Sequence, residues 1–211
     1  MDRDGLPFVI CPLVIGASLI GFGQVLGGLL FVALAVALGL FFRDPERTPP
    51  DNLNAGDILS PADGRVLHAG ESQPSVAPDG NWLQVSIFLS PLDVHVNRAP
   101  VGGRVIDVTY RPGRFLAAFN KRSAQENERS EILVESGGQL IAFRQVVGFL
   151  ARRVVCRIKP DMVVDRGQRF GIMKFGSRMD VFMPITAHVS VKVGDVVRGG
   201  ETVIGTLASM K

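Results

Sequence analysis

The hydrophobic positions divide this chain into two parts. Residues 6–42 contain no Asp, Glu, Lys or Arg and are almost entirely apolar. A membrane-spanning helix needs about 20 apolar residues, so this segment holds one long span or two short ones. Glycines near residues 21–24 and 27–28 would separate two spans of about 16–18 residues, at or below that minimum. We therefore predict a re-entrant or tightly packed helical hairpin, with residues 1–42 forming a membrane-associating segment.

The remaining part, residues 43–211, has a different pattern of apolar residues. Its apolar residues occur in short runs rich in Val, Ile and Phe, bounded by Gly and Pro turns, and no long amphipathic helical pattern is visible. Runs such as 85–89, 101–109 and 140–147 are typical of strands. The pattern predicts a mainly β domain with a minor helical contribution (minor α+β), built as a compact β-sandwich or barrel-like unit.

A similar spacing of valines and glycine-containing turns occurs twice in the β part, at residues 162–171 and 191–205. Self-similarity of this kind indicates a fold assembled from two related units. We predict two related halves that resemble lipoyl or biotinyl carrier domains.

The charge distribution favours a membrane partner over nucleic acid. The net charge is +3, and residues 1–42 contribute almost none of the charged side chains. Residues 144–159 hold five bases and no acid, which suits an anionic membrane surface but is also typical of a solvated strand face. With one Trp and one Tyr for stacking, nucleic acid is not expected as a partner. Arg43 and Arg47 follow the apolar segment and indicate that the β domain lies on the cytoplasmic side of a cell membrane.

Residues Gly176 and Ser177 join two apolar runs, and by themselves they are compatible with an ordinary turn. A serine after a glycine can also attack the carbonyl carbon of the preceding peptide bond, because glycine has no Cβ and tolerates strained backbone angles. The resulting ester can eliminate, cutting the chain and leaving dehydroalanine, which hydrolyses to a pyruvoyl group. Such self-processing requires a base for the hydroxyl proton and donors for the oxyanion.

Two further residues lie in turn-like segments that contain proline, and their side chains suit such chemistry. Asp63 is in the bend of residues 60–64, and His95 is in residues 90–100. With Ser177 they could form a nucleophile, base and orienting group, an arrangement defined by geometry and not by chain order. Asp63 is equally compatible with turn formation, and His95 with a hydrogen bond to backbone at a strand end. The three His and two Cys residues show no metal-ligand spacing, so we predict no metal site.

Residues 175–180, Phe-Gly-Ser-Arg-Met-Asp, resemble the cleavage motif of the short form of the phosphatidylserine decarboxylases. The resemblance extends in order along nearly the whole chain. Its other segments are residues 41–47, 60–64, 88–100, 110–115, 127–129 and 148–153.

The resemblance implies a proenzyme that cuts itself between Gly176 and Ser177. The products would be a β chain of residues 1–176 and an α chain of residues 177–211, which remain partners. Ser177 would become a covalent pyruvoyl cofactor that forms a Schiff base with the amine of phosphatidylserine and acts as an electron sink during loss of CO₂. The product would be phosphatidylethanolamine, which places the protein in phospholipid biosynthesis at the cell membrane.

The resemblance also assigns Asp63 and His95 to self-cleavage or to proton transfer during decarboxylation. Long-form relatives carry a second His three residues after the first, where this chain has Arg98. Because that second His is the usual base of the triad, the identity of the cleavage base in this chain is open.

Two other functions are compatible with the sequence. The first is a membrane-anchored lipoyl-like carrier or adaptor without catalysis, although a carrier needs a modifiable Lys at a hairpin tip and the bend at Asp63 and Gly64 has none. The second is a pyruvoyl decarboxylase of another lipid with a serine headgroup. The sequence leaves the oligomeric state open, a homo-oligomer included.

Overall fold

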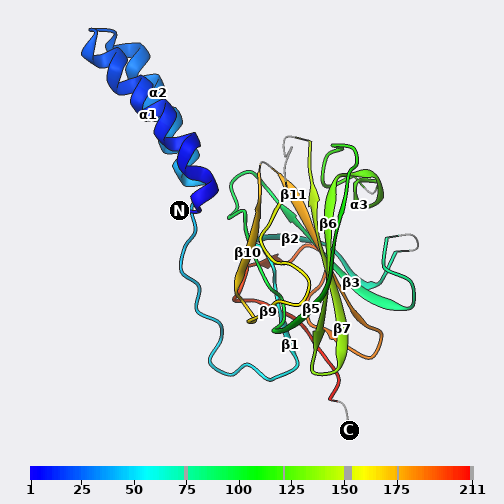
Figure 1. Cartoon of the computed structure of the whole chain (residues 1–211). Coiled ribbons are helices and arrows are strands. Elements are labelled where there is room, and N and C mark those ends of the chain that lie inside the picture. Colours follow the sequence, from blue (N-terminus) through cyan, green and yellow to red (C-terminus); the bar gives the residue numbers. More distant parts are fainter. Residues whose placement is uncertain (74–75, 121, 150–153, 175, 210–211) are drawn as a thin grey trace.

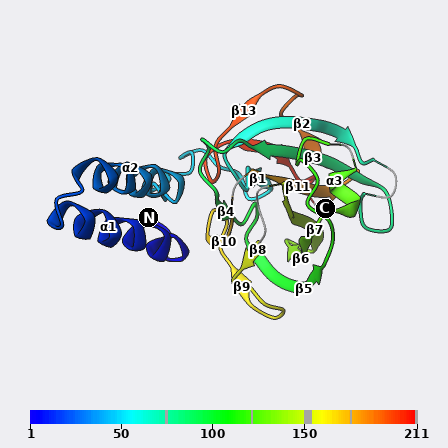
Figure 2. The same ribbon diagram turned by 90° about the horizontal axis from the view of Figure 1, so that it is seen from above.

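An apolar helical hairpin precedes a β domain in the computed structural model of this chain, as Figures 1 and 2 show. The structure describes residues 1–73, 76–120, 122–149, 154–174 and 176–209. A short 3₁₀ turn, η1 (Arg3–Gly5), leads into α1 (Leu6–Gly21), and α2 (Val25–Phe41) returns antiparallel to it. The predicted helical hairpin is therefore confirmed.

The two helices of the hairpin cross closely at a pair of glycines. A Cβ added to Gly28 would lie 2.7 Å from the carbonyl oxygen of Gly16, so only glycine permits this approach. Apart from Ser18 and Gln24, the outward-facing side chains are apolar, and Phe22 at the tip is exposed. By length and composition the stretch Arg3–Gly21 is able to cross a membrane, while Val25–Phe41 is shorter.

The β domain consists of antiparallel strands with one short helix, α3 (Ser123–Glu126). The strands are β1 (Asp57–Leu59), β2 (Gly64–Glu71), β3 (Trp82–Leu89), β4 (Val96–Arg98), β5 (Gly103–Arg111), β6 (Arg129–Ser136), β7 (Gln139–Val147), β8 (Val154–Cys156), β9 (Val163–Val164), β10 (Arg169–Met173), β11 (Ser177–Pro184), β12 (His188–Val189), β13 (Val196–Val197) and β14 (Val203–Thr206).

The main sheet has eight strands in the order β13-β2-β3-β11-β7-β6-β5-β9, and two three-stranded sheets, β1-β14-β12 and β4-β10-β8, complete the domain. This arrangement confirms the mainly β class. The main sheet begins at β13 and ends at β9 without pairing these two strands, so the domain is not a closed barrel.

The hydrogen bonds of the two halves of the main sheet correspond to each other. Val66 of β2 donates its N–H to the Asp195 carbonyl before β13, and Val105 of β5 donates to the Met162 carbonyl before β9. The two segments with the repeated valine and glycine spacing form β13 and β14 in one half, and β9 and β10 in the other. A likeness of these halves to lipoyl carrier domains is not tested by the pairings and stays a prediction.

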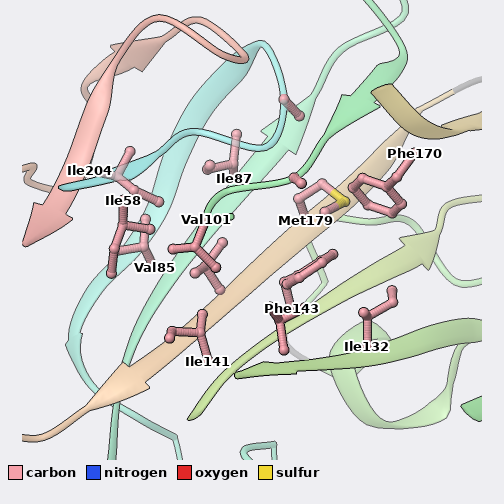
Figure 3. Packing of buried hydrophobic residues seen from close by; sticks show 14 of the residues in the cluster. Ile58, Val85, Ile87, Val101, Ile132, Ile141, Phe143, Phe170, Met179 and Ile204 are labelled. Atoms are coloured by element: carbon pink, nitrogen blue, oxygen red, sulfur yellow. The ribbon is translucent and has the colours of Figure 1, made fainter. Parts of the chain in front are cut away.

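The core lies against the middle of the main sheet, where β11 runs between β3 and β7. Figure 3 shows Met179 of β11 close to Phe143 and Phe170, in a cluster that also includes Ile87 and Ile141. Every residue of β11 from Ser177 to Met183 is buried. In the sequence after Ser177 the residues Met179, Val181 and Met183 alternate with others, which is the period of a half-buried strand, but the structure covers both faces of β11.

The second face of β11 carries buried charges. Asp180 accepts hydrogen bonds from Arg178 at 2.6 Å and from Arg144 at 3.1 Å, and Phe182 packs beside them against Ala142. The two guanidinium groups hold the pKa of the Asp180 carboxyl below its ordinary value, against the opposing effect of burial. The polar residues Arg178 and Asp180 therefore lie on a second buried face of β11, although their polarity suggests exposure in the sequence.

Candidate active site

The Gly176–Ser177 bond lies where the chain passes from β10 into β11. Ser177 is the first residue of β11 and pairs with Leu89 at the end of β3 and with Val147 at the end of β7. The bond is therefore at the end of the main sheet where the pairings of β11 with β3 and β7 begin.

Gly176 adopts a left-handed conformation, with φ of +70°. An added Cβ would meet nothing within 4 Å, so the requirement for glycine at this position is conformational and not steric. The requirement at Gly148 is steric, because a Cβ added there would lie 2.1 Å from the Gly176 carbonyl oxygen. Gly148 thus allows the scissile carbonyl to lie directly against the backbone that follows β7.

The Ser177 hydroxyl is fully buried and has no hydrogen-bond partner among the described residues. Leaving a buried polar group unsatisfied costs about 1–3 kcal/mol. Such a cost is unusual in a folded protein and is typical of groups kept available for chemistry. The Ser177 hydroxyl is therefore buried and not held by another described side chain.

His95 lies beside the Gly176–Ser177 bond as a neutral imidazole. Its Nδ1 is 2.9 Å from the Asp93 carbonyl oxygen. Because a carbonyl oxygen can only accept a hydrogen bond, Nδ1 is the donor and carries the hydrogen. Its Nε2 is then unprotonated and accepts the N–H of Gly176 at 3.3 Å. Burial lowers the pKa of His95 to about 4, so the ring is neutral at physiological pH and can act as a base.

The end of the apolar hairpin forms one wall of this site. Phe41 and Phe42 are buried with Val96 and Ile172, and the Phe41 ring lies 4.2 Å from the His95 ring between centroids. These contacts contribute to the burial that keeps His95 neutral. The last residues of the apolar segment, 41 and 42, therefore pack within the β domain and not outside it.

Asp63 lies in a cluster of ion pairs around the linker that follows the hairpin. Its carboxylate accepts hydrogen bonds from Arg47 at 2.6 Å and from the Gly199 N–H at 2.8 Å. Arg98 belongs to the same region, where it donates to Asp44 at 3.3 Å. The structure thus brings Gly176, Ser177 and His95 together, while the described contacts of Asp63 and Arg98 hold the linker.

Replacing Asp63 by asparagine is expected to destabilise the uncut protein by about 2 kcal/mol, because the largely buried Arg47 would keep only its longer pair with Glu201. Urea unfolding of the Ser177→Ala protein with and without Asp63→Asn measures this change. Asp161→Asn is the control, because its pair with Arg104 is exposed and contributes about 0.5 kcal/mol or less. Unchanged stability combined with loss of self-cleavage in the Ser177 protein would assign Asp63 a direct chemical role.

Two of the bases that suggested a membrane-binding surface are engaged in ion pairs. Arg144 is buried against Asp180, and Arg157 donates to Asp2 at 2.7 Å. The surface interpretation is wrong for Arg144, which is buried, whereas Arg157 is partly exposed and paired with Asp2 and Asp4. Arg152 and Arg153 lie outside the described residues.

Sequence reasoning missed several residues of this site. Gly148 has a role only because the Gly176 carbonyl lies on it, and Asp93 orients His95 through its backbone and not its carboxylate. Asn127 donates to the carbonyls of Val147 and Leu116, which fastens the loop before α3 to the end of β7. An asparagine in a polar stretch carries no signal of such a role.

Comparison with known proteins places these residues in a family. A family model described as phosphatidylserine decarboxylase matches residues 34–205. The chain is 46% identical over 196 residues to the phosphatidylserine decarboxylase proenzyme of Chlorobium chlorochromatii, covering 92% of this chain and 86% of that protein. It is 40% identical over 210 residues to the proenzyme of the same name from Desulfotalea psychrophila, covering 97% and 95%. The corresponding protein of Magnetococcus marinus is 41% identical over 209 residues, covering 97% and 94%.

Proposed function

The chain belongs to the phosphatidylserine decarboxylase family, and from this premise we propose that it cuts itself at Gly176–Ser177 and converts phosphatidylserine to phosphatidylethanolamine. The observation that carries the proposal is the buried Ser177 hydroxyl, which has no hydrogen-bond partner among the described residues, next to Gly176, whose N–H contacts a neutral His95. A turn that served only to connect two strands would require neither feature.

Self-cleavage would proceed in two bond exchanges. Ser177 Oγ loses its proton and attacks the Gly176 carbonyl carbon, and the peptide C–N bond breaks to leave an ester and a free amine. Removal of the Ser177 Cα proton then breaks the Cβ–Oγ bond, which frees the Gly176 carboxylate and leaves dehydroalanine. Hydrolysis of the imine tautomer of dehydroalanine releases ammonia and gives the pyruvoyl ketone. We assign His95 to the proton transfers, because its Nε2 already contacts the residue before Ser177.

The junction also fits a pyruvoyl group at residue 177. That group supplies a carbonyl that condenses with the substrate amine and withdraws the electron pair left when CO₂ departs. His95 would hold a proton for return to the carbon that loses CO₂. The apolar wall of Phe41 and Phe42 would exclude water from the same place. Asp63 would act at a distance, by keeping Arg47 and the linker in position.

The hairpin would hold the enzyme at the membrane that contains its substrate. The stretch Arg3–Gly21 has the length and composition of a membrane span, and Arg43 and Arg47 favour a cytoplasmic location for the β domain. The hairpin base is packed against the site, so the reactive serine would be near the bilayer surface.

The intact mass of the purified protein tests the proposal. We expect two fragments, residues 1–176 and residues 177–211, the second beginning with a pyruvoyl group, whereas Ser177→Ala should stay as one chain of 211 residues. The cut protein should release CO₂ from phosphatidylserine, and the Ser177→Ala protein should not. A single uncut chain in both samples would support an adaptor. Cleavage with activity on a different serine-headgroup lipid alone would change the substrate and keep the chemistry.

A further inference from the structure

Several loops meet at the end of the main sheet where Ser177 lies. β3 ends at Leu89 and β7 ends at Val147, and both residues pair with Ser177. β5 ends at Arg111, opposite the first residue of β6. The described residues of the loops that follow β3, β5 and β7 therefore lie around the start of β11. In Figure 1 this is the upper end of the β domain, and the hairpin projects toward the same side.

Each of these loops exposes a large apolar side chain. Leu92 after β3 is 83% exposed, Phe119 after β5 is 68% exposed, and Phe149 after β7 is 70% exposed. Among the described residues of the β domain, the exposed aromatic side chains all lie at or beside this end: Tyr110, Phe115, Phe119 and Phe149. At the opposite end the exposed apolar side chains are aliphatic, as with Val163 and Ile185.

The Leu92 loop is tied directly to the base of the hairpin. Arg43 donates from Nη1 to the Leu40 carbonyl at 2.8 Å and from Nη2 to the Leu92 carbonyl at 2.6 Å. The exposed loop tip and the last turn of α2 are therefore held by one side chain. The side chains of Arg114 and Arg122 flank the same loops and are about two-thirds exposed, and both pair with Glu126.

We propose that Leu92, Phe119 and Phe149 form a second membrane contact, which enters the interfacial layer of the bilayer and presents the Ser177 site to lipid headgroups. Aromatic side chains prefer the level of the headgroups. The occupant is a bilayer and not a second copy of the chain, because the surface is continuous with a hairpin whose own outer face is apolar. The proposal rests on the proposed function, because it concerns how the same site reaches its lipid substrate.

A tryptophan placed on this surface tests the contact. The full chain carries Trp82→Phe to remove its one native Trp, Ser177→Ala to keep it uncut, and either Phe149→Trp or Val163→Trp. Val163 is the matched control, because it is 74% exposed and lies at the opposite end of the domain. The proteins are reconstituted in anionic vesicles with ordinary or brominated acyl chains. Brominated chains should reduce the emission at residue 149 to about half or less and leave residue 163 nearly unchanged.

Other outcomes would overturn the proposal. Emission that is insensitive to bromine at both positions would place the loop tips in water. Equal quenching at both positions would show adsorption of the whole domain without a defined face. Protection of residue 149 from an aqueous quencher in detergent, together with dimer formation, would assign the surface to a second copy. The measurement uses an uncut protein, so its result does not depend on decarboxylase activity. A failure of the proposed function would appear only in the mass and CO₂ assays.

Discussion

Replacing His95 by glutamine is expected to slow self-cleavage by about 10²–10⁴-fold, the range typical for loss of a general base. Glutamine keeps a side chain of similar reach but cannot accept the hydroxyl proton. His95 is the group with the required properties in the described site, since its Nε2 is unprotonated and 3.3 Å from the Gly176 nitrogen. Arg98, which stands where long-form relatives have a second His, donates to Asp44 and to backbone carbonyls and is not a base.

The rate of cleavage after cell-free synthesis, followed by gel or mass, measures this effect. His188→Gln is the control, because His188 is exposed on β12. The pH profile of the wild-type rate gives a second readout. Burial sets the pKa of His95 at about 4, and protonation removes the base, so the rate should be level near neutral pH and fall as the pH drops through about 4. Cleavage of His95→Gln at the wild-type rate would exclude His95 as the base.

Replacing Gly148 by alanine is expected to slow self-cleavage by at least about 10²-fold, because misplacing a reacting group by about 1 Å has an effect of this size. The new Cβ would lie 2.1 Å from the Gly176 carbonyl oxygen and 2.9 Å from its carbon, so the scissile carbonyl would have to move. Gly148 is not expected to take part in the chemistry. It acts by leaving room for the bond that Ser177 attacks.

Mass spectrometry of Gly148→Ala should find an uncut chain, and hydroxylamine should not cleave it, because no ester forms when the first step is blocked. Gly39→Ala is the control, since an added Cβ there meets nothing within 4 Å. Near-ultraviolet circular dichroism of each variant in the Ser177→Ala background separates a blocked reaction from a failure to fold. A folded Gly148→Ala protein that cuts itself as fast as wild type would contradict the steric argument.

Cleavage would not release the α chain. Its residues supply β11, β12, β13 and β14. β11 pairs with β3 and β7, β13 pairs with β2, and β14 pairs with β1, all strands of residues 1–176, while β12 pairs with β14. β11 alone pairs along its length with β3 and along most of its length with β7, and it is buried on both faces. The two chains therefore remain one folded unit, which keeps residue 177 beside His95 after the bond is cut.

The sequence by itself determined the features that depend on composition and local order. The apolar hairpin follows from a charge-free run with glycines at its centre, and the mainly β class follows from short runs of branched residues between turns. The junction at Gly176 and Ser177 could be singled out because its chemistry needs only two adjacent residues. These features require no knowledge of which segments meet in space.

Only the tertiary structure decided how the site is assembled. Strand pairing brings Val147 to Ser177 and so places Gly148 on the scissile carbonyl, and no pattern near either glycine encodes that meeting. The same applies to Phe41 on His95, and to Arg144 beside Asp180 inside the sheet. Local periodicity reports on one strand and its exposed or buried side, whereas burial and pKa depend on every element packed around a residue. For this reason β11 reads as half-buried in the sequence and is the covered centre of the folded domain.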